Sequence, residues 1–317
     1  MPFASRHDLG PGSALLALCL SARLSSAQTC CTTTGANELG VVERDRSAVL
    51  GVQLDHDRGY GSFNAQGTFR SLTDAEVDDI VLALGGGIRL WPRELQINGA
   101  VPLRAQYREL RGQSGAHLGL GDASLALRYV LVDGGRPGGG LSPFVEPFAG
   151  LRFPTGTPPE AASEPTLVDA TGDGSLLVYV GFLVVEALGD SDAVRLSAAL
   201  GHRFSRRVAS PTGPQSFTPG EEITARLGFA HTLDMFSSVE AFATLRATTT
   251  AHLDGNHVTD SATHRVRVGA ALAHFLAFPT WQLVGAISLD PPISHFGSNV
   301  PFAGTSLTLG LRRNFGL

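Results

Sequence analysis

The residues whose type and spacing could do chemistry are arginines, which recur at alternate positions in segments that are otherwise apolar. All 24 cationic residues of the 317-residue chain are arginine, and lysine is absent. A guanidinium stays charged at every accessible pH and can hold a carboxylate or phosphate through two parallel hydrogen bonds. Anion binding is therefore one interpretation of this pattern. A GC-rich genome, whose codons favour arginine over lysine, explains the preference equally well.

Histidines and acids gather in one segment, where a metal site could be sought. His252, His257 and His264 are accompanied by Asp254 and Asp260. Spacings of five and seven residues in a polar segment are not typical of a structural metal site. We therefore expect a solvated loop there, and the sequence predicts no bound metal and no cofactor.

Catalytic groups are not singled out by their spacing. Serine and histidine are plentiful, but no pair is placed as nucleophile and base. The run GDGS at 172–175 lacks the strand, helix and following lysine of a phosphate-binding loop. The chain is therefore predicted not to be an enzyme. A barrel enzyme acting on envelope lipid stays open as an alternative.

The arginines lie in segments with a period of two. In 223–233, Leu227 and Phe229 alternate with Arg226 and Gly228, and comparable alternation occurs in 124–132, 193–205, 265–272 and 306–312. Successive side chains of a strand point to opposite faces, so each segment has an apolar and a polar face. The longer segments suit tilted membrane strands better than the roughly 5–6 residues of an average soluble strand.

Composition narrows the class of protein. Only 17% of residues are charged and 38 are glycine, against about 25% charged and about 7% glycine in ordinary domains. A hydrophobic content of 43% excludes disorder, and a pI near 6.0 argues against nucleic acid as a partner. The longest apolar run, 176–185, is too short for a transmembrane helix.

The segments between the predicted strands alternate in length. Short turns alternating with long external loops are typical of outer-membrane barrels. The long ones are 71–78, 108–119, 154–173, 206–220, 250–263 and 290–302. We predict an all-β fold, a closed antiparallel transmembrane β-barrel of the outer-membrane type with about 12 strands (10–14). An extra strand-like run at 48–56 either belongs to the first strand or is periplasmic.

The chain ends carry targeting signals. Residues 1–27 have a weakly positive start, a short apolar core and a small-residue cleavage site, as in a secretory signal peptide. Residues 28–59 are expected to be a periplasmic segment and 60–317 the barrel. Cys30 and Cys31 are too few for a disulfide scaffold. Phe315 and Leu317 continue the alternation of the last strand, like the signal read by the outer-membrane insertion machinery. The predicted location is the outer membrane.

Three motifs follow one another in the middle of the chain: GLGDASL at 119–125, FPTG at 153–156 and TGDGSL at 171–176. Their order resembles the outer-membrane channel family named for the meta-pathway of phenol degradation. The likeness covers about 119–189, roughly a quarter of the chain. The three motifs consist largely of residues that favour turns. The resemblance implies a transporter-like barrel and brings no catalytic residue.

The polar face of the strands predicts the interior. It carries seven arginines, two acids and two of the neighbouring aromatic rings, namely Arg128, Glu146, Phe148, Arg152, Arg195, Arg226, Glu240, Phe242, Arg246, Arg267 and Arg312. Such a lumen suits small hydrophobic, aromatic or anionic solutes, so we expect a passive channel. Expected partners are a small-molecule solute, outer-membrane lipid and the insertion machinery. A structural ion-pair network that plugs a narrow barrel is the competing interpretation.

Overall fold

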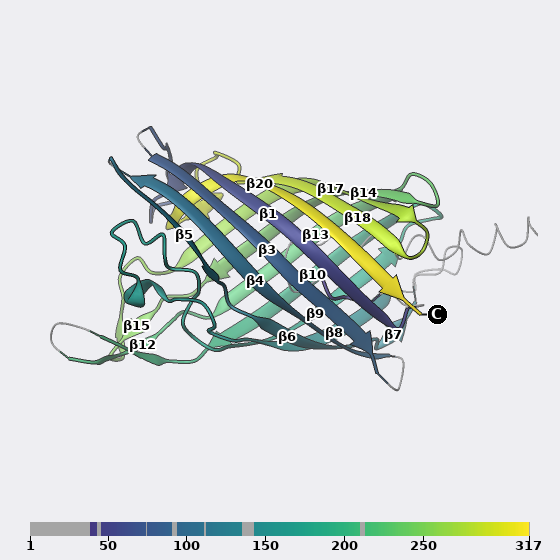
Figure 1. The fold of residues 1–317 in the computed structure, drawn as a ribbon, viewed down its shortest axis with the longest axis horizontal. Helices are drawn as coiled ribbons and strands as arrows, with labels where there is room; N and C mark the ends of the chain where they lie inside the picture. Colours follow the sequence, from purple (N-terminus) through teal and green to yellow (C-terminus); the bar gives the residue numbers. More distant parts are fainter. Residues whose placement is uncertain are drawn as a thin grey trace, which may run out of the picture.

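The protein is a single β-barrel (Figure 1). The computed structural model describes residues 39–42, 46–73, 75–90, 94–110, 112–134, 143–209 and 213–316. The expected signal peptide, Cys30, Cys31 and the terminal Leu317 lie outside the described residues.

Twelve long strands form the barrel wall within the described residues. They are β1 (Ala48–Phe63), β3 (Ala75–Arg89), β4 (Leu95–Leu110), β6 (Ser124–Tyr129), β8 (Phe144–Arg152), β9 (Leu177–Ala187), β10 (Asp192–Arg203), β13 (Glu222–Thr232), β14 (Ser237–Thr248), β17 (Thr263–Ala277), β18 (Trp281–Leu289) and β20 (Val300–Phe315). Each pairs antiparallel with the next, and β1 pairs with β20 to close the barrel. The predicted fold class and strand number are confirmed.

The first strand begins earlier than expected. The boundary that the sequence placed at residue 60 falls inside β1, which starts at Ala48 and pairs with β20 from Ala48↔Phe315 onward. The run 48–56 is therefore part of the first barrel strand and not a periplasmic segment. Asp55 and Asp57 sit in mid-strand because their side chains face the lumen, where charges find partners.

Connections differ at the two barrel ends. Short turns, such as 188–191, 233–236 and 278–280, lie at the end that holds Ala48 and Phe315. The opposite end carries the long loops and the small strands that extend the wall: β2 (Phe69–Ser71), β5 (Gln113–Leu120) and β19 (Gly297–Ser298). At the short-turn end, β7 (Val132–Asp133) adds to β8. The expected alternation of long and short connections is confirmed, except that the expected loop 108–119 is mostly strand, in β4 and β5.

A second small sheet forms outside the wall, at the long-loop end (Figure 1). Two long loops contribute to it through β11 (Arg206–Val208), β12 (Gln215–Thr218), β15 (His252–Leu253) and β16 (Asn256–His257). The loop between β8 and β9 contains a single 3₁₀ turn, η2 (Pro159–Ala161). In the described part of the chain, no helix is long and apolar enough to cross a membrane.

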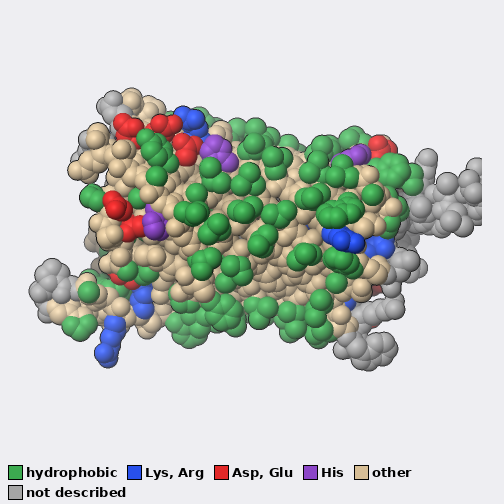
Figure 2. Space-filling model, in the orientation of Figure 1, with side chains coloured by type: hydrophobic (Ala, Val, Ile, Leu, Met, Phe, Trp, Pro, Cys, Tyr) green, Lys and Arg blue, Asp and Glu red, His purple; other side chains and the backbone are tan. Residues whose placement is uncertain are grey.

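The distribution of polar and apolar side chains is the reverse of that in a soluble protein, with apolar side chains outside and many polar ones inside. Large apolar side chains such as Leu84 and Leu227 are 60% and 57% exposed on the outer face. Figure 2 shows these side chains covering the middle of the barrel, with the charged groups near its two ends. Buried side chains include many polar ones, such as Gln53, Gln96 and Arg312. An apolar band of this kind suits a hydrocarbon environment.

Candidate functional site

All eleven predicted site residues lie on the lumen side of the wall. The pleat puts alternate residues inside, so the partners Arg226 and Glu240 project inward from β13 and β14 while Leu227 projects outward. Their placement follows the predicted period. Whether they bind a solute is a separate question, and this role stays a prediction.

Two buried carboxylates each bind arginine inside the barrel. Glu146 accepts a 2.7 Å hydrogen bond from Nε of Arg128 and a 2.8 Å bond from Nε2 of Gln96. Glu240 lies 2.8 Å from Nη2 of Arg226 and 3.6 Å from Nη1 of Arg195. Buried charges persist only when they are paired in this way.

The two arginines are also stacked on aromatic rings. The guanidinium of Arg128 lies 4.8 Å from the ring centre of Phe148, and that of Arg226 lies 4.0 Å from Phe242. Phe148 lies across Gly181 of the next strand, where a Cβ would approach its ring to 2.5 Å. Glycine at this position lets the ring of Phe148 rest against the wall.

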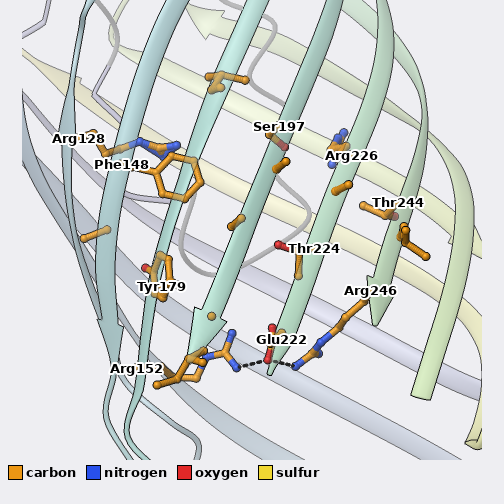
Figure 3. Close-up of a pocket in the computed structure, with 18 residues that line it drawn as sticks. Arg128, Phe148, Arg152, Tyr179, Ser197, Glu222, Thr224, Arg226, Thr244 and Arg246 are labelled. Atoms are coloured by element: carbon orange, nitrogen blue, oxygen red, sulfur yellow. Dashed lines mark hydrogen bonds and ion pairs between the residues drawn. The ribbon is translucent and has the colours of Figure 1, made fainter. Parts of the chain in front are cut away.

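A cavity of about 320 Å³ opens between β6, β8, β9, β10, β13 and β14 (Figure 3). Among the described residues that line the cavity, four are arginines, Arg128, Arg152, Arg226 and Arg246, and Glu222 is the single acid. Apolar side chains from β9, among them Leu177 and Leu183, form the opposite surface. The apolar strand β9 therefore gives this part of the lumen an apolar wall.

Three arginines meet at Glu222. Its Oε2 accepts a hydrogen bond from Arg203, and lies 3.2 Å from Nη2 of Arg246 and 3.5 Å from Nη1 of Arg152. Asp173, from the loop after β8, lies 3.5 Å from Arg152 and 3.3 Å from Arg203. Three cations therefore share two carboxylates. We call these five residues the arginine cluster.

The interior holds more acidic side chains than the sequence pattern indicated. Because 28–59 was expected to be a periplasmic segment, the acids of β1 were missed. Asp57 pairs with Arg267 at 2.9 Å, and Asp79 of β3 pairs with Arg104 of β4. The count of seven arginines against two acids was therefore wrong. Continuing the period of two upstream from residue 60 would have revealed Asp55 and Asp57, and continuing it through β3 would have revealed Asp79.

A short piece of the N-terminal segment lies inside the barrel at its short-turn end. Val42 donates its backbone N–H to Oε1 of Gln96 at 2.9 Å, and its carbonyl accepts from Arg89 at 3.0 Å. Arg312 donates to the carbonyl of Val41. Leu39 is fully buried against the inner wall. We call residues 39–42 the inner segment.

The triple glycine at 85–87 makes this placement possible. A Cβ at Gly87 would lie 1.9 Å from the carbonyl oxygen of Gly40, so no larger residue fits there without displacing the inner segment. Glycine in a strand interior often marks such a close approach of another backbone.

The three family-like motifs meet at the long-loop end. Asp122, of the first motif, accepts the backbone N–H of Gly156 at 3.0 Å and of Asp173 at 2.7 Å, which belong to the second and third. The loop 153–176 is thereby attached to the wall. Its Val168 is fully buried, and Arg108 of β4 donates to the Leu167 carbonyl. The loop narrows this end of the lumen.

Within the same loop, Asp169 organises a tight turn. Its carboxylate accepts the backbone N–H of Ser163 at 2.6 Å, with a further bond from the Ser163 hydroxyl. These donors, the Ser163 N–H foremost, hold the pKa of Asp169 below its usual value of 3.8.

The histidine-rich segment does not converge on one point. His252 and His257 stack at 4.4 Å on the outer sheet, while His264 lies against the carbonyl of His295. Among the described residues, no group of three or more His, Cys, Asp or Glu side chains could hold a metal ion.

One serine–histidine pair lies on the outer wall, where the enzyme alternative would need it. Oγ of Ser237 is 2.9 Å from Nδ1 of His274. Asp234 contacts the serine hydroxyl at 3.4 Å. In a catalytic triad the carboxylate instead binds and orients the imidazole. This trio therefore has the geometry of a capped turn.

Known proteins resemble this chain in their fold. No protein-family model matches the sequence, and no curated protein does so. The family resemblance suggested by the three motifs therefore stays a prediction. Among solved structures, an outer membrane channel from Pseudomonas putida F1 superimposes with a TM-score of 0.69 at 16% identity, covering 85% of this chain and 96% of that one.

Weaker likenesses are found to other barrels. The β domain of the Bordetella autotransporter BrkA gives a TM-score of 0.46 at 14% identity, over 85% of this chain and 100% of that one. A FadL homologue of Pseudomonas aeruginosa gives 0.43 at 9%, over 92% and 98%. The protein thus has the fold of an outer-membrane β-barrel, and it is similar in structure to an outer membrane channel.

Proposed function

We propose that the protein is a passive outer-membrane channel for small solutes and that its lumen favours anions. The arginine-lined cavity carries this proposal, because four arginines and one acid face the same space. Cationic side chains on a wall of low dielectric constant raise the local concentration of anions. The similarity in fold to an outer membrane channel supports the proposal.

Location and partners belong to the same proposal. The exposed apolar band would contact outer-membrane lipid, and the final strand, with Phe315 on its outer face, would be recognised by the insertion machinery. The solute would enter past the loop 153–176 and leave past the inner segment. No catalytic step is proposed.

A barrel closed by its own chain is the second candidate function. The inner segment favours it, because Val41 and Val42 are held inside the barrel by hydrogen bonds with Arg312 and Gln96. In that case the lumen would be structural, and the ion pairs would serve stability alone.

Planar-bilayer recording separates the two candidates. A channel gives discrete conductance steps in KCl, and the arginine excess predicts a reversal potential on the anion side. A structural barrel gives no current although it inserts. Heat-modifiable migration on gels reports insertion independently of conductance, so a silent barrel and a misfolded one are distinguished.

A further inference from the structure

The cavity beside the arginine cluster has an anion-binding end. The cluster holds three arginines and two acids, which leaves one positive charge in excess. The side chain of Arg246 is 54% exposed to the lumen, and it shares a single oxygen of Glu222 with Arg203. Because a guanidinium has five N–H donors, Arg246 and Arg152 retain donors for a second carboxylate.

A buried hydroxyl without a hydrogen-bond partner is a second indication of an anion in this cavity. Tyr179 lines the cavity and is 8% exposed, yet its Oη has no hydrogen-bond partner in the described part of the chain. Buried polar atoms are nearly always hydrogen-bonded. In Figure 3 Tyr179 lies between Phe148 and Arg152 on the cavity wall. A carboxylate held by Arg152 would supply the missing acceptor.

The other end of the cavity is apolar. Phe148 and Tyr179 approach each other edge to face, with ring centres 6.3 Å apart, and Leu177 and Leu183 line the same side. A volume of about 320 Å³ lies at the lower limit of the roughly 300–1,000 Å³ of ligand pockets. It suits one ring and a short polar group.

We infer that the cavity binds a small monocarboxylate that carries a single ring. The carboxylate lies between Arg152 and Arg246 and accepts a hydrogen bond from Oη of Tyr179. The ring lies against Phe148 and Leu183. One excess positive charge matches one negative charge, so a dicarboxylate or an uncharged analogue is disfavoured. Binding must stay weak enough for release if the solute is to cross. The inference rests on the proposed channel function.

Benzoate, benzyl alcohol, acetate and phthalate are the probes that separate these contributions. Single-channel KCl current is recorded while each is added to one side. Benzoate is expected to interrupt the current at low millimolar concentration. Benzyl alcohol lacks the charge, acetate lacks the ring and phthalate carries a second charge. Each should therefore need at least a tenfold higher concentration than benzoate to interrupt the current.

Three variants test the residues. Arg246→Gln should weaken block by benzoate about tenfold or more, and Tyr179→Phe about threefold to tenfold, because each loses a hydrogen bond to a charged group. Arg58→Gln is the matched control, since Arg58 lies on the outer wall paired with Glu76, and it should behave as wild type. Unblocked KCl conductance shows that each variant is folded.

Two results would overturn the inference. One is equal block by benzoate and benzyl alcohol, and the other is unchanged block in both cavity variants. If the barrel passes no current at all, the channel proposal fails instead. Saturation-transfer NMR of benzoate with the detergent-solubilised protein then tests the cavity separately, with loss of the signal in Arg246→Gln expected. Absence of a signal in wild type would contradict the site.

Discussion

The backbone N–H of Val42 donates a 2.9 Å hydrogen bond to Oε1 of Gln96 inside the barrel. The other end of the Gln96 amide donates to Glu146, which in turn binds Arg128 at the edge of the arginine-lined cavity. A single glutamine therefore joins the inner segment to the lumen wall. Detachment of this segment and the shape of the cavity are thus physically connected.

Replacing Gln96 by alanine should release the inner segment. Val42 loses its acceptor and Glu146 loses a donor, and a typical intramolecular hydrogen bond contributes about 0.5–1.5 kcal/mol. We expect a severalfold larger fraction of time in a higher conductance state, measured by single-channel recording. Ser306→Ala, elsewhere on the lumen face, is the control. Unchanged conductance in Gln96→Ala would show that the segment does not obstruct the lumen.

Asp122→Asn should loosen the loop 153–176. The amide retains one acceptor oxygen and so cannot bind both Gly156 and Asp173, at a cost of about 1–3 kcal/mol for the donor left without a partner. Hydrogen exchange and limited proteolysis should both rise within this loop. Asp254→Asn is a matched control, because Asp254 accepts the N–H of Ser216 in a different loop. Equal protection in wild type and Asp122→Asn would contradict the assignment.

The turn around Asp169 should open in acid. Its pKa is lowered in the folded loop, so the stabilisation is complete above the usual value of 3.8 and is lost as the pH falls through the lower folded value. The protection of the Ser163 and Glu164 amides from exchange, taken relative to the intrinsic rate at each pH, should therefore fall only below about pH 4. Asp169→Asn should remove this pH dependence. Loss of this protection between pH 7 and pH 5 would require a different titrating group.

Outer and inner faces should tolerate charge differently. Leu227→Arg places a guanidinium in the apolar band and should cost about 2–4 kcal/mol near the bilayer midplane. Thr224→Arg, three residues earlier on the same strand, faces the lumen and should insert almost normally. The heat-modifiable fraction on gels measures insertion. Equal defects in the two variants would mean that the faces are wrongly assigned.

The wall could be predicted from sequence because it depends on local pattern. Lipid on one side and water on the other force residues such as Leu227 and Arg226 to alternate, and that period survives in a single sequence. The start of β1 was missed because residues 55–58 (DHDR) are polar on both faces of the strand and hide the period of two. Strand membership there is decided by pairing with β20, a contact distant in sequence.

Contacts between distant segments could not be predicted. The three motifs were recognised as turn sequences. Nothing in them shows that the carboxylate of Asp122, in the first motif, binds backbone N–H groups of the second and third motifs. The partners of Glu222 depend on the stagger of β8, β10, β13 and β14, which sequence spacing does not give. The inner segment has no periodicity, and only the triple glycine opposite it left a signal.

The reversal potential of the wild-type channel across a KCl gradient tests the central claim most directly. The arginine-lined cavity predicts anion selectivity, which is stronger at low salt because the Debye length is longer there. Arg152→Gln combined with Arg246→Gln should reduce it. Arg226 and Arg267 are less suitable targets, because Arg226 is paired with Glu240 and Arg267 with Asp57. Anion selectivity that falls in the double variant would support the account, whereas a cation-selective wild type, or an inserted barrel without current, would contradict it.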